Sequence, residues 1–292
     1  MPIDLGNGRQ LASDAGWGCM IRCGQMALYT TIARTCDKNS FKPAELIQKF
    51  FSETSPQLGP FSLQRLVMTA RDNLGKAPGE WFRATTFSLA LENCINSSPI
   101  QTEFSLVNVL DNSLYWEEIY SRALLYHAPP LSIENCISQL CETSWEKKVL
   151  LVIHTMLGVD NIDPRYEPFL QTMCRLESFI GFLGGEQNKA YYFYGMDSRE
   201  YLYIDPHFCR NAEISVTKED VNRTFFGSKP YFKLSRESLN SSVSIWILLE
   251  NSNHFSEFYH KYVKLSRNMN DDFFFCDALR RSEEDLEDII EF

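Results

Sequence analysis

The sequence lacks long apolar runs and clusters of basic residues, and each absence excludes a class of protein. The longest apolar stretch, near Val149 to Val159, is interrupted by His154. The start at Met1 has no charged segment followed by an apolar one, so we expect neither a signal peptide nor an integral membrane segment. The 28 Lys and Arg residues are scattered among 38 Asp and Glu residues, which argues against nucleic acid as a partner.

Histidine is scarce, and the cysteines follow no paired spacing. The 5 histidines and 9 cysteines form no CxxC pair and no ligand-like His spacing, so we expect no metal and no other cofactor. An odd number of irregularly spaced cysteines is typical of reduced thiols, which favours a cytoplasmic location. With 292 residues, 44% of them hydrophobic, the chain can bury a large core.

One cysteine stands at a position that suits a nucleophile. The turn Gly16-Trp17-Gly18 leads into a helix-like segment that runs from Cys19 to about Thr35. The free N–H groups and the macrodipole at a helix N-terminus favour negative charge, which can lower a thiol pKa from about 8.5 to roughly 3.5–7.5. We therefore interpret Cys19 as a candidate nucleophile, and Cys23, one helical turn further on, as a buried core thiol.

A base and an acid for that nucleophile stand far downstream. Asp205 and His207 end a strand-like run, and side chains two residues apart on a strand share a face. The carboxylate would fix the imidazole tautomer while the imidazole takes the thiol proton. Cys19, His207 and Asp205 therefore form a complete candidate catalytic set.

The segment at residues 13–26, SDAGWGCMIRCGQM, closely resembles the catalytic segment of the autophagins, the autophagy-related cysteine peptidases. Their second hallmark is an Asp-Pro-His triplet that closes a hairpin after a Gly-Gly loop. Here the triplet stands at 205–207 and the glycine pair at 184–185. The resemblance runs from about residue 14 to residue 265, patchily through the middle.

The resemblance implies an α+β, papain-like thiol peptidase that acts on ubiquitin-like autophagy modifiers. Such an enzyme cuts after a glycine near the modifier's C-terminus and also releases the modifier from phosphatidylethanolamine, which allows transient contact with autophagic membranes. By position, Cys19 would be the nucleophile, His207 the general base and then acid, and Asp205 the orienting carboxylate. The backbone N–H of Cys19 would contribute to the oxyanion hole.

The resemblance also implies substrate-binding residues. Trp81 stands where the family keeps a tryptophan that covers the substrate's narrow glycine end. Gly184, Gly185 and Gln187 belong to the loop that packs over the active site, and the family often has proline at the position of Gln187. From the residues alone, we would interpret Trp81 as a core side chain and the glycine pair as an ordinary turn.

Other functions stay open. In the family an upstream tyrosine helps to form the oxyanion hole, and no tyrosine precedes Cys19 in this sequence. The alternative is therefore a catalytically weak protein that binds the modifier and lacks the N-terminal oxyanion-hole segment. A papain-like peptidase with another substrate, or a transglutaminase-type acyl transferase, also fits the Cys-His-Asp set but not the residues that flank it.

We expect three parts in the chain. Residues 1–265 form a papain-like peptidase domain, which includes a small accessory subdomain at 97–148. Residues 266–292 form an acidic, flexible tail, in which Phe273-Phe274-Phe275 is a candidate anchor for a partner.

Hydrophobic periodicity and turn residues predict the main elements. The predicted helices are Cys19–Thr35, Pro43–Phe51, Ser62–Asn73, Thr86–Cys94, Trp116–Tyr126, Pro164–Leu176 and Phe255–Lys264. The predicted strands are Val149–His154, Ala190–Met196, Glu200–Asp205 and Val243–Leu249, with a turn at 197–199.

Overall fold

The computed structural model describes residues 3–4, 10–36, 42–53, 58–197, 200–208, 232–269 and 275–280. Its strands, in chain order, are β1 (Ile3–Asp4), β2 (Gln10–Leu11), β3 (Phe104–Val109), β4 (Ser113–Tyr115), β5 (Lys148–Asn161), β6 (Phe179–Glu186), β7 (Lys189–Asp197), β8 (Glu200–Ile204), β9 (Phe232–Ser235), β10 (Asn240–Leu249) and β11 (Cys276–Ala278). Within the described residues, seven of them form the central sheet in the order β3-β5-β10-β6-β7-β8-β9. β3 runs parallel to β5, and the other neighbouring strands of this sheet are antiparallel.

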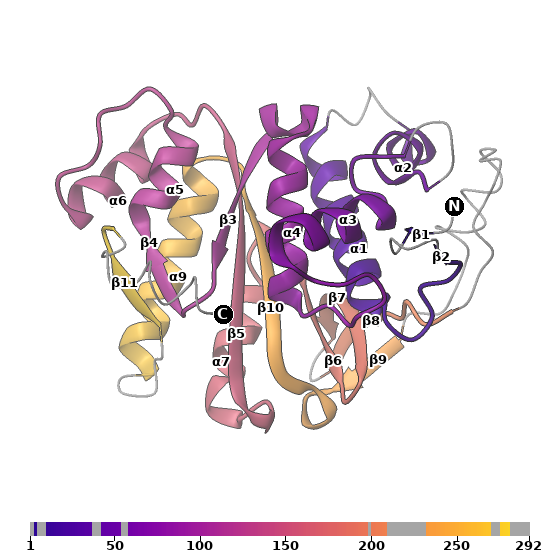
Figure 1. The fold of residues 1–292 in the computed structure, drawn as a ribbon. Helices are drawn as coiled ribbons and strands as arrows, with labels where there is room; N and C mark the ends of the chain where they lie inside the picture. Colours follow the sequence, from indigo (N-terminus) through magenta and orange to yellow (C-terminus); the bar gives the residue numbers. More distant parts are fainter. Residues whose placement is uncertain are drawn as a thin grey trace.

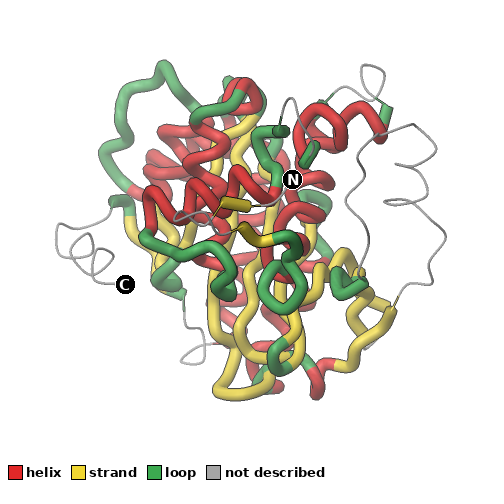
Figure 2. Tube along the Cα trace, turned by 45° about the vertical axis from the view of Figure 1, so that its right-hand side comes forward, coloured by secondary structure: helices red, strands yellow, loops and turns green. Residues whose placement is uncertain are grey.

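Helices lie on both sides of the central strands (Figures 1 and 2). They are α1 (Cys19–Thr35), α2 (Pro43–Phe51), α3 (Leu63–Leu74), α4 (Ala84–Asn96), α5 (Trp116–Ala123), α6 (Ile133–Glu142), α7 (Glu167–Cys174) and α9 (Ser252–Met269), with short 3-10 helices at Pro99–Thr102, Pro164–Tyr166 and Arg236–Ser238. In Figure 1, α1 to α4 lie to the right of β5 and β10, whereas α5, α6 and α9 lie to the left.

The central strands separate two hydrophobic clusters. On β5, Val149 and Ile153 belong to the cluster that includes residues of α5, α6, α7 and α9, whereas Leu150 and Val152 belong to the cluster that includes residues of α1 to α4. Successive side chains of a strand point to opposite faces, so a strand covered on both faces must be apolar throughout. This explains the long apolar run near residue 149.

Most of the predicted elements are confirmed, although several ends shift. α1 and α2 have the predicted bounds. α3 begins after Ser62, whose hydroxyl accepts a hydrogen bond from the backbone N–H of Arg65 at 3.3 Å, and ends at Gly75 with φ 66°. β5 is longer than predicted, α5 ends three residues earlier than the predicted helix, and the predicted turn at 197–199 lies partly outside the described residues.

The sequence pattern did not indicate β3, β4, β6, β9, β11 or α6. β6 shows the reason, because three of its eight residues, Gly181, Gly184 and Gly185, are glycines, which weaken strand propensity. Its neighbours β10 and β7 supply the pairing that its own residues do not predict. Pairing with neighbouring strands, and not its own sequence pattern, therefore determines that β6 is a strand.

The region proposed as an accessory subdomain, 97–148, is joined to the rest of the protein. β3 is a strand of the central sheet. β4, α5 and α6 follow it and lie on the side of the sheet that also carries α9 (Figure 1). How much of 97–148 forms a unit of its own stays a prediction.

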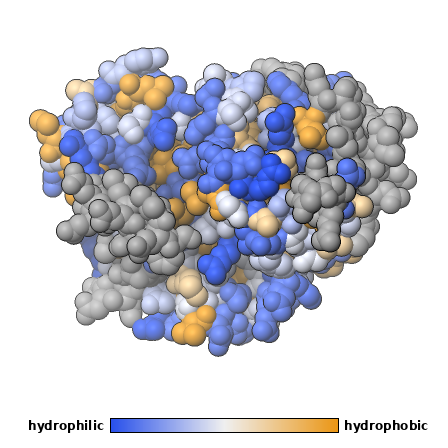
Figure 3. All heavy atoms as spheres, viewed as in Figure 1, coloured by the Kyte–Doolittle hydropathy of each residue, from blue (hydrophilic) through white to orange (hydrophobic). Residues whose placement is uncertain are grey.

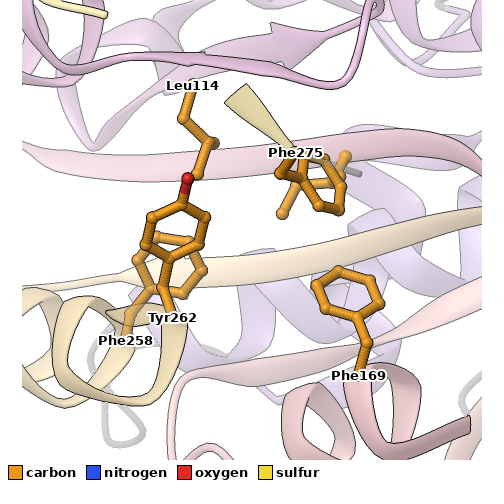
Figure 4. A pocket seen from close by; sticks show the side chains of 6 residues that line it. Leu114, Phe169, Phe258, Tyr262 and Phe275 are labelled. Carbon is orange, nitrogen blue, oxygen red and sulfur yellow. The ribbon is translucent and has the colours of Figure 1, made fainter. Parts of the chain in front are cut away.

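Residues 275–280 of the expected flexible tail pack against the body of the protein. β11 pairs in parallel with β4, and Asp277 accepts a hydrogen bond from the indole N–H of Trp116 at 3.0 Å. Phe275 is buried, and its ring centroid lies 5.1 Å from that of Phe169 (Figure 4). Phe275 is thus part of the protein's own core, while Phe273, Phe274 and residues 281–292 lie outside the described residues.

The surface combines a largely hydrophilic face with separate apolar patches (Figure 3). Of the large apolar side chains that the structure describes, Leu131, Tyr126 and Val159 are the most exposed, at 92%, 87% and 87%. Among the described helices, none has the length and apolar character that crossing a bilayer requires.

We predict that Gly24→Ala destabilises the protein. A Cβ at position 24 of α1 would lie 2.1–2.6 Å from ring atoms of Phe87 on α4, and overpacking of this kind costs about 1–3 kcal/mol. Alanine favours a helix by up to about 1 kcal/mol over glycine, so a net loss would show that the clash outweighs propensity. Urea unfolding measures the change. The control is Gly195→Ala, where the nearest atom lies 4.0 Å away; equal effects at the two sites would contradict the prediction.

Because His154 is buried, we predict that the free energy of unfolding of the protein decreases in acid. The imidazole is 6% exposed, its Nε2 lies 2.7 Å from Ser88 Oγ, and burial lowers its pKa from 6.5 to about 3. Between these values the unfolded chain binds a proton that the folded chain does not, so this stability is present above pH 6.5 and is lost as pH falls. The loss should approach roughly 1 kcal/mol per pH unit.

The measurement is the free energy of unfolding between pH 7 and pH 4. His154→Gln should flatten its pH dependence, whereas the same change at the exposed His260 should not. Identical slopes for wild type and His154→Gln would contradict the prediction.

Candidate active site

Cys19 is the first residue of α1 and follows a tight turn. The carbonyl of Asp14 accepts hydrogen bonds from the N–H groups of Trp17, at 3.2 Å, and Gly18, at 2.9 Å. Gly16 has φ +86°, a conformation that other residues rarely adopt. A Cβ at Gly18 would lie 2.6 Å from Asp14 Cβ. Gly16 allows the positive φ and Gly18 leaves room for Asp14, so the turn that leads into α1 needs both glycines.

Asp205 and His207 are in contact, but not for the reason that the sequence suggests. β8 ends at Ile204, so the two residues lie beyond the strand instead of on one of its faces. Asp205 Oδ1 accepts a hydrogen bond from the backbone N–H of His207 at 2.8 Å and lies 2.6 Å from its ring Nδ1. A local turn around the carboxylate, not strand alternation, brings the pair together.

The β6–β7 hairpin links the cysteine to this pair. Ala190 makes a backbone hydrogen bond to the Cys19 thiol. The next residue, Tyr191, packs its ring perpendicular to the imidazole of His207, with 5.8 Å between centroids. The electrostatic influence of Asp205 reaches Cys23, one turn below Cys19. All three candidate catalytic residues therefore border one hairpin.

The glycine pair lies in strand β6 rather than in a loop. Gly185 pairs with Ala190, and a Cβ at Gly185 would lie 1.9 Å from the carbonyl oxygen of Lys189. Gly184 is less constrained, since its nearest contacts are at 3.5 Å. Gln187 occupies the two-residue turn with Asn188, whose φ is 62°. Gly185 thus permits the close hairpin that presents Ala190 to Cys19.

The Cys19 thiol is partly buried, and this sets its electrostatics. Burial raises its pKa, while backbone hydrogen bonds from Ala190, Met20 and Cys19 itself act in the opposite direction, and the charge of Asp14 raises the pKa further. The expectation that the helix terminus lowers this pKa is therefore wrong for the described geometry, because the cost of desolvation exceeds the helix contribution. Cys23 is fully buried, as predicted, and burial raises its pKa well above the usual range.

Trp81 is not a core residue, since it is 38% exposed. It stands just before α4, and its link to Cys19 is indirect. Gly79, two residues earlier, lies against Leu11 in the segment that leads to the nucleophile turn. An exposed indole is available to a substrate, but its contact with one stays a prediction.

Tyr191 and Ala190 belong to the site and were not singled out as candidates from the sequence. Tyr191 also donates a hydrogen bond from its hydroxyl to Glu186 Oε2 at 3.1 Å. The available sequence signal for Tyr191 was the alternation of side chains along the strand. It places Tyr191 and Phe193 on one face of β7 and Tyr192 on the other. Within the described part of the chain, no group of three His, Cys, Asp or Glu side chains could hold a metal ion.

A family model described as the peptidase C54 catalytic domain matches residues 4–261. The chain belongs to the peptidase C54 family. This membership confirms the autophagin resemblance and the α+β, papain-like cysteine peptidase fold, which the helices and mixed sheet of this C54 domain display.

Named relatives of this C54 chain come from fungi and plants. It is 30% identical over 265 residues to the probable cysteine protease ATG4 of Chaetomium globosum, which covers 86% of this chain and 54% of that protein. It is 28% identical over 281 residues to cysteine protease ATG4b of Arabidopsis thaliana (88% and 56%) and 29% identical over 252 residues to the probable cysteine protease ATG4 of Scheffersomyces stipitis (84% and 44%). The chain spans about half the length of these curated relatives.

We predict that limiting iodoacetamide labels Cys19 before Cys23. Cys19 is partly exposed, whereas Cys23 is completely buried, and alkylation requires access as well as a thiolate, so a preference of about tenfold or more is expected. Peptide mass mapping measures both sites in one sample. Cys23→Ser should leave the rate at Cys19 unchanged. Equal labelling of the two thiols would contradict the described burial.

Proposed function

We propose that this chain is a cysteine peptidase that cleaves ubiquitin-like autophagy modifiers after a C-terminal glycine, both in precursors and in conjugates with phosphatidylethanolamine. Family membership and the cysteine protease names of the relatives support the reaction class. The observation that carries the proposal is the 2.6 Å contact between His207 Nδ1 and Asp205 Oδ1, beside the hairpin that holds the Cys19 thiol.

In the proposed reaction, Cys19 Sγ attacks the carbonyl carbon of the scissile glycine and its proton passes to Nε2 of His207. Asp205 accepts the Nδ1–H, which keeps Nε2 free to take that proton. The backbone N–H of Cys19 donates to the oxyanion. The imidazolium then protonates the leaving amine, the C–N bond breaks, and a thioester remains. Water, deprotonated by His207, hydrolyses the thioester and restores the thiol.

We assign Trp81 as a lid over the terminal glycine of the substrate, because its indole is exposed and Gly79, two residues before it, lies against Leu11 in the segment that leads to the turn before Cys19. We assign Gly184, Gly185 and Gln187 to the substrate site as well, because they belong to the hairpin that presents Ala190 to Cys19, and the absence of a Cβ at Gly185 keeps this hairpin tight.

The proposed partners are the modifier and its phosphatidylethanolamine conjugate, with transient contact to autophagic membranes during release. We propose a cytoplasmic location for this activity. The seven cysteines described with their side chains are free, which is typical of a reducing compartment.

The burial of Cys19 supports a second candidate, a protein that binds the modifier with little turnover. Burial raises the pKa of this thiol and so disfavours the thiolate that attacks a carbonyl. The two candidates share the binding surface and differ in whether the bond is cut.

The deciding experiment incubates the chain with a ubiquitin-like autophagy modifier extended past its glycine, and with the same modifier conjugated to phosphatidylethanolamine in liposomes. We expect release after the glycine in both arms, measured by intact mass. Cys19→Ala and His207→Ala should abolish cleavage, and Asp205→Asn should reduce kcat by about 10³-fold or more because the imidazole tautomer is lost.

Cys23→Ser is the matched control, since this thiol is buried and one helical turn away, and it should keep most of the activity. Binding of the modifier by wild type without any cleavage would reject the peptidase and favour the second candidate. Equal loss in Cys23→Ser and Cys19→Ala would reject the assignment of the nucleophile.

A further inference from the structure

The turn before Cys19 is tied to a buried part of the protein by one guanidinium. Arg22, on the first turn of α1, donates from Nε to Asp14 Oδ2 at 2.7 Å. Its two terminal nitrogens bind both carboxylate oxygens of Glu53, with 3.2 Å for the Nη2–Oε2 pair. Its side chain is only 29% exposed. One cation therefore joins the nucleophile turn to the segment that follows α2.

The contacts around Arg22 reach the backbone that precedes the thiol. The N–H of Arg22 donates to the carbonyl of Gly18 at 3.0 Å, and the carbonyl of Asp14 accepts from the N–H of Gly18 at 2.9 Å. The Asp14 side chain lies so close to Gly18 that a Cβ there would approach Asp14 Oδ2 to 2.8 Å. Fixing the Asp14 carboxylate thus fixes the peptide that enters Cys19.

The Asp14 carboxylate, which Arg22 binds, also acts on the thiol through its charge. Among the described residues, Asp14 is the charged group whose influence raises the pKa of Cys19. A carboxylate next to a thiol opposes the thiolate. A guanidinium bound to that carboxylate offsets the opposition, and its planar fork can bind two carboxylates at once.

We propose that Arg22 is a positioning residue for Cys19: it clamps Asp14 so that the turn at 13–18 holds the Cys19 N–H and thiol in place, and it compensates the Asp14 charge near the thiol. This inference rests on the proposed peptidase function of Cys19. The carboxylate of Glu53 anchors the clamp, and Gln25 completes it by accepting from Arg22 Nη1 at 3.1 Å while donating to the Phe61 carbonyl at 2.8 Å.

The test measures the pH dependence of iodoacetamide alkylation at Cys19, which needs no substrate. Arg22→Gln should shift the alkylation midpoint up by about one pH unit and slow labelling at pH 7 about tenfold, because Asp14 is then uncompensated. Arg22→Gln/Asp14→Asn should bring the midpoint back toward that of wild type. A merely structural Arg22 would lower the melting temperature without this recovery.

The matched control is Arg71→Gln, which removes an exposed guanidinium paired with the neighbouring Asp72 on α3. It should leave the midpoint unchanged. An unshifted midpoint in folded Arg22→Gln, or the same shift in Arg71→Gln, overturns the proposal. If Arg22→Gln does not fold, Asp14→Asn decides: a lowered midpoint supports the proposal and an unchanged one overturns it.

Turnover separates the two proposals. If wild type cleaves the modifier, Arg22→Gln should lower kcat about tenfold with KM within about twofold, since the reacting atoms and not the substrate are displaced. If wild type does not cleave, the peptidase function fails, while the alkylation profiles still report whether Arg22 controls the thiol.

Discussion

Helix α1 meets α4 through a contact that leaves no room for a side chain, and the candidate site depends on it. Gly24 lies against the Phe87 ring, which packs at 6.2 Å between centroids from Trp246 of β10. On its other side, α1 contacts Tyr192, whose hydroxyl donates to the Ile180 carbonyl of β6 at 2.7 Å and lies 3.1 Å from Thr30 Oγ1. The helix is thus held between α4 and the sheet, and its N-terminal thiol cannot move independently of the β6–β7 hairpin.

This rigidity has an electrostatic cost. Holding Cys19 against Ala190 removes water from the thiol, and the resulting rise in pKa exceeds the help from nearby backbone N–H groups. The same exclusion of water strengthens every hydrogen bond that would stabilise an oxyanion. A buried nucleophile therefore needs a base that takes its proton during attack, and the ordered pair of His207 and Asp205 beside the hairpin meets that need.

The local sequence pattern predicted those parts of the site that form through contacts between residues close together in the sequence. The turn and apolar periodicity gave the bounds of α1, and the sequence correctly associated Asp205 with His207, although a turn around the carboxylate replaces the expected strand geometry. The sequence pattern could not predict the properties that depend on burial by distant parts of the chain. Burial raises the pKa of Cys19, and a backbone hydrogen bond from Ala190, about 170 residues downstream, opposes that rise; the hairpin that carries Ala190 includes glycine-rich β6, which pairs with β10 and β7. The burial of Phe275 likewise depends on partners far away in the chain.

The position of β10 also determines which distant segments must meet before the central sheet is complete. β10 lies between β5 and β6, yet it comes after β6, β7, β8 and the Asp205–His207 pair in the sequence. Until residues 240–249 insert, strands β6 to β9, of which β6 and β7 pack directly against α1, are not joined to β5 and β3. Closing such long loops costs entropy before the contacts form, which slows folding. Cys19 and His207 both lie beside the β6–β7 hairpin, whose two strands pair with each other and pack directly against α1, so the site depends on a pairing that neither motif contains.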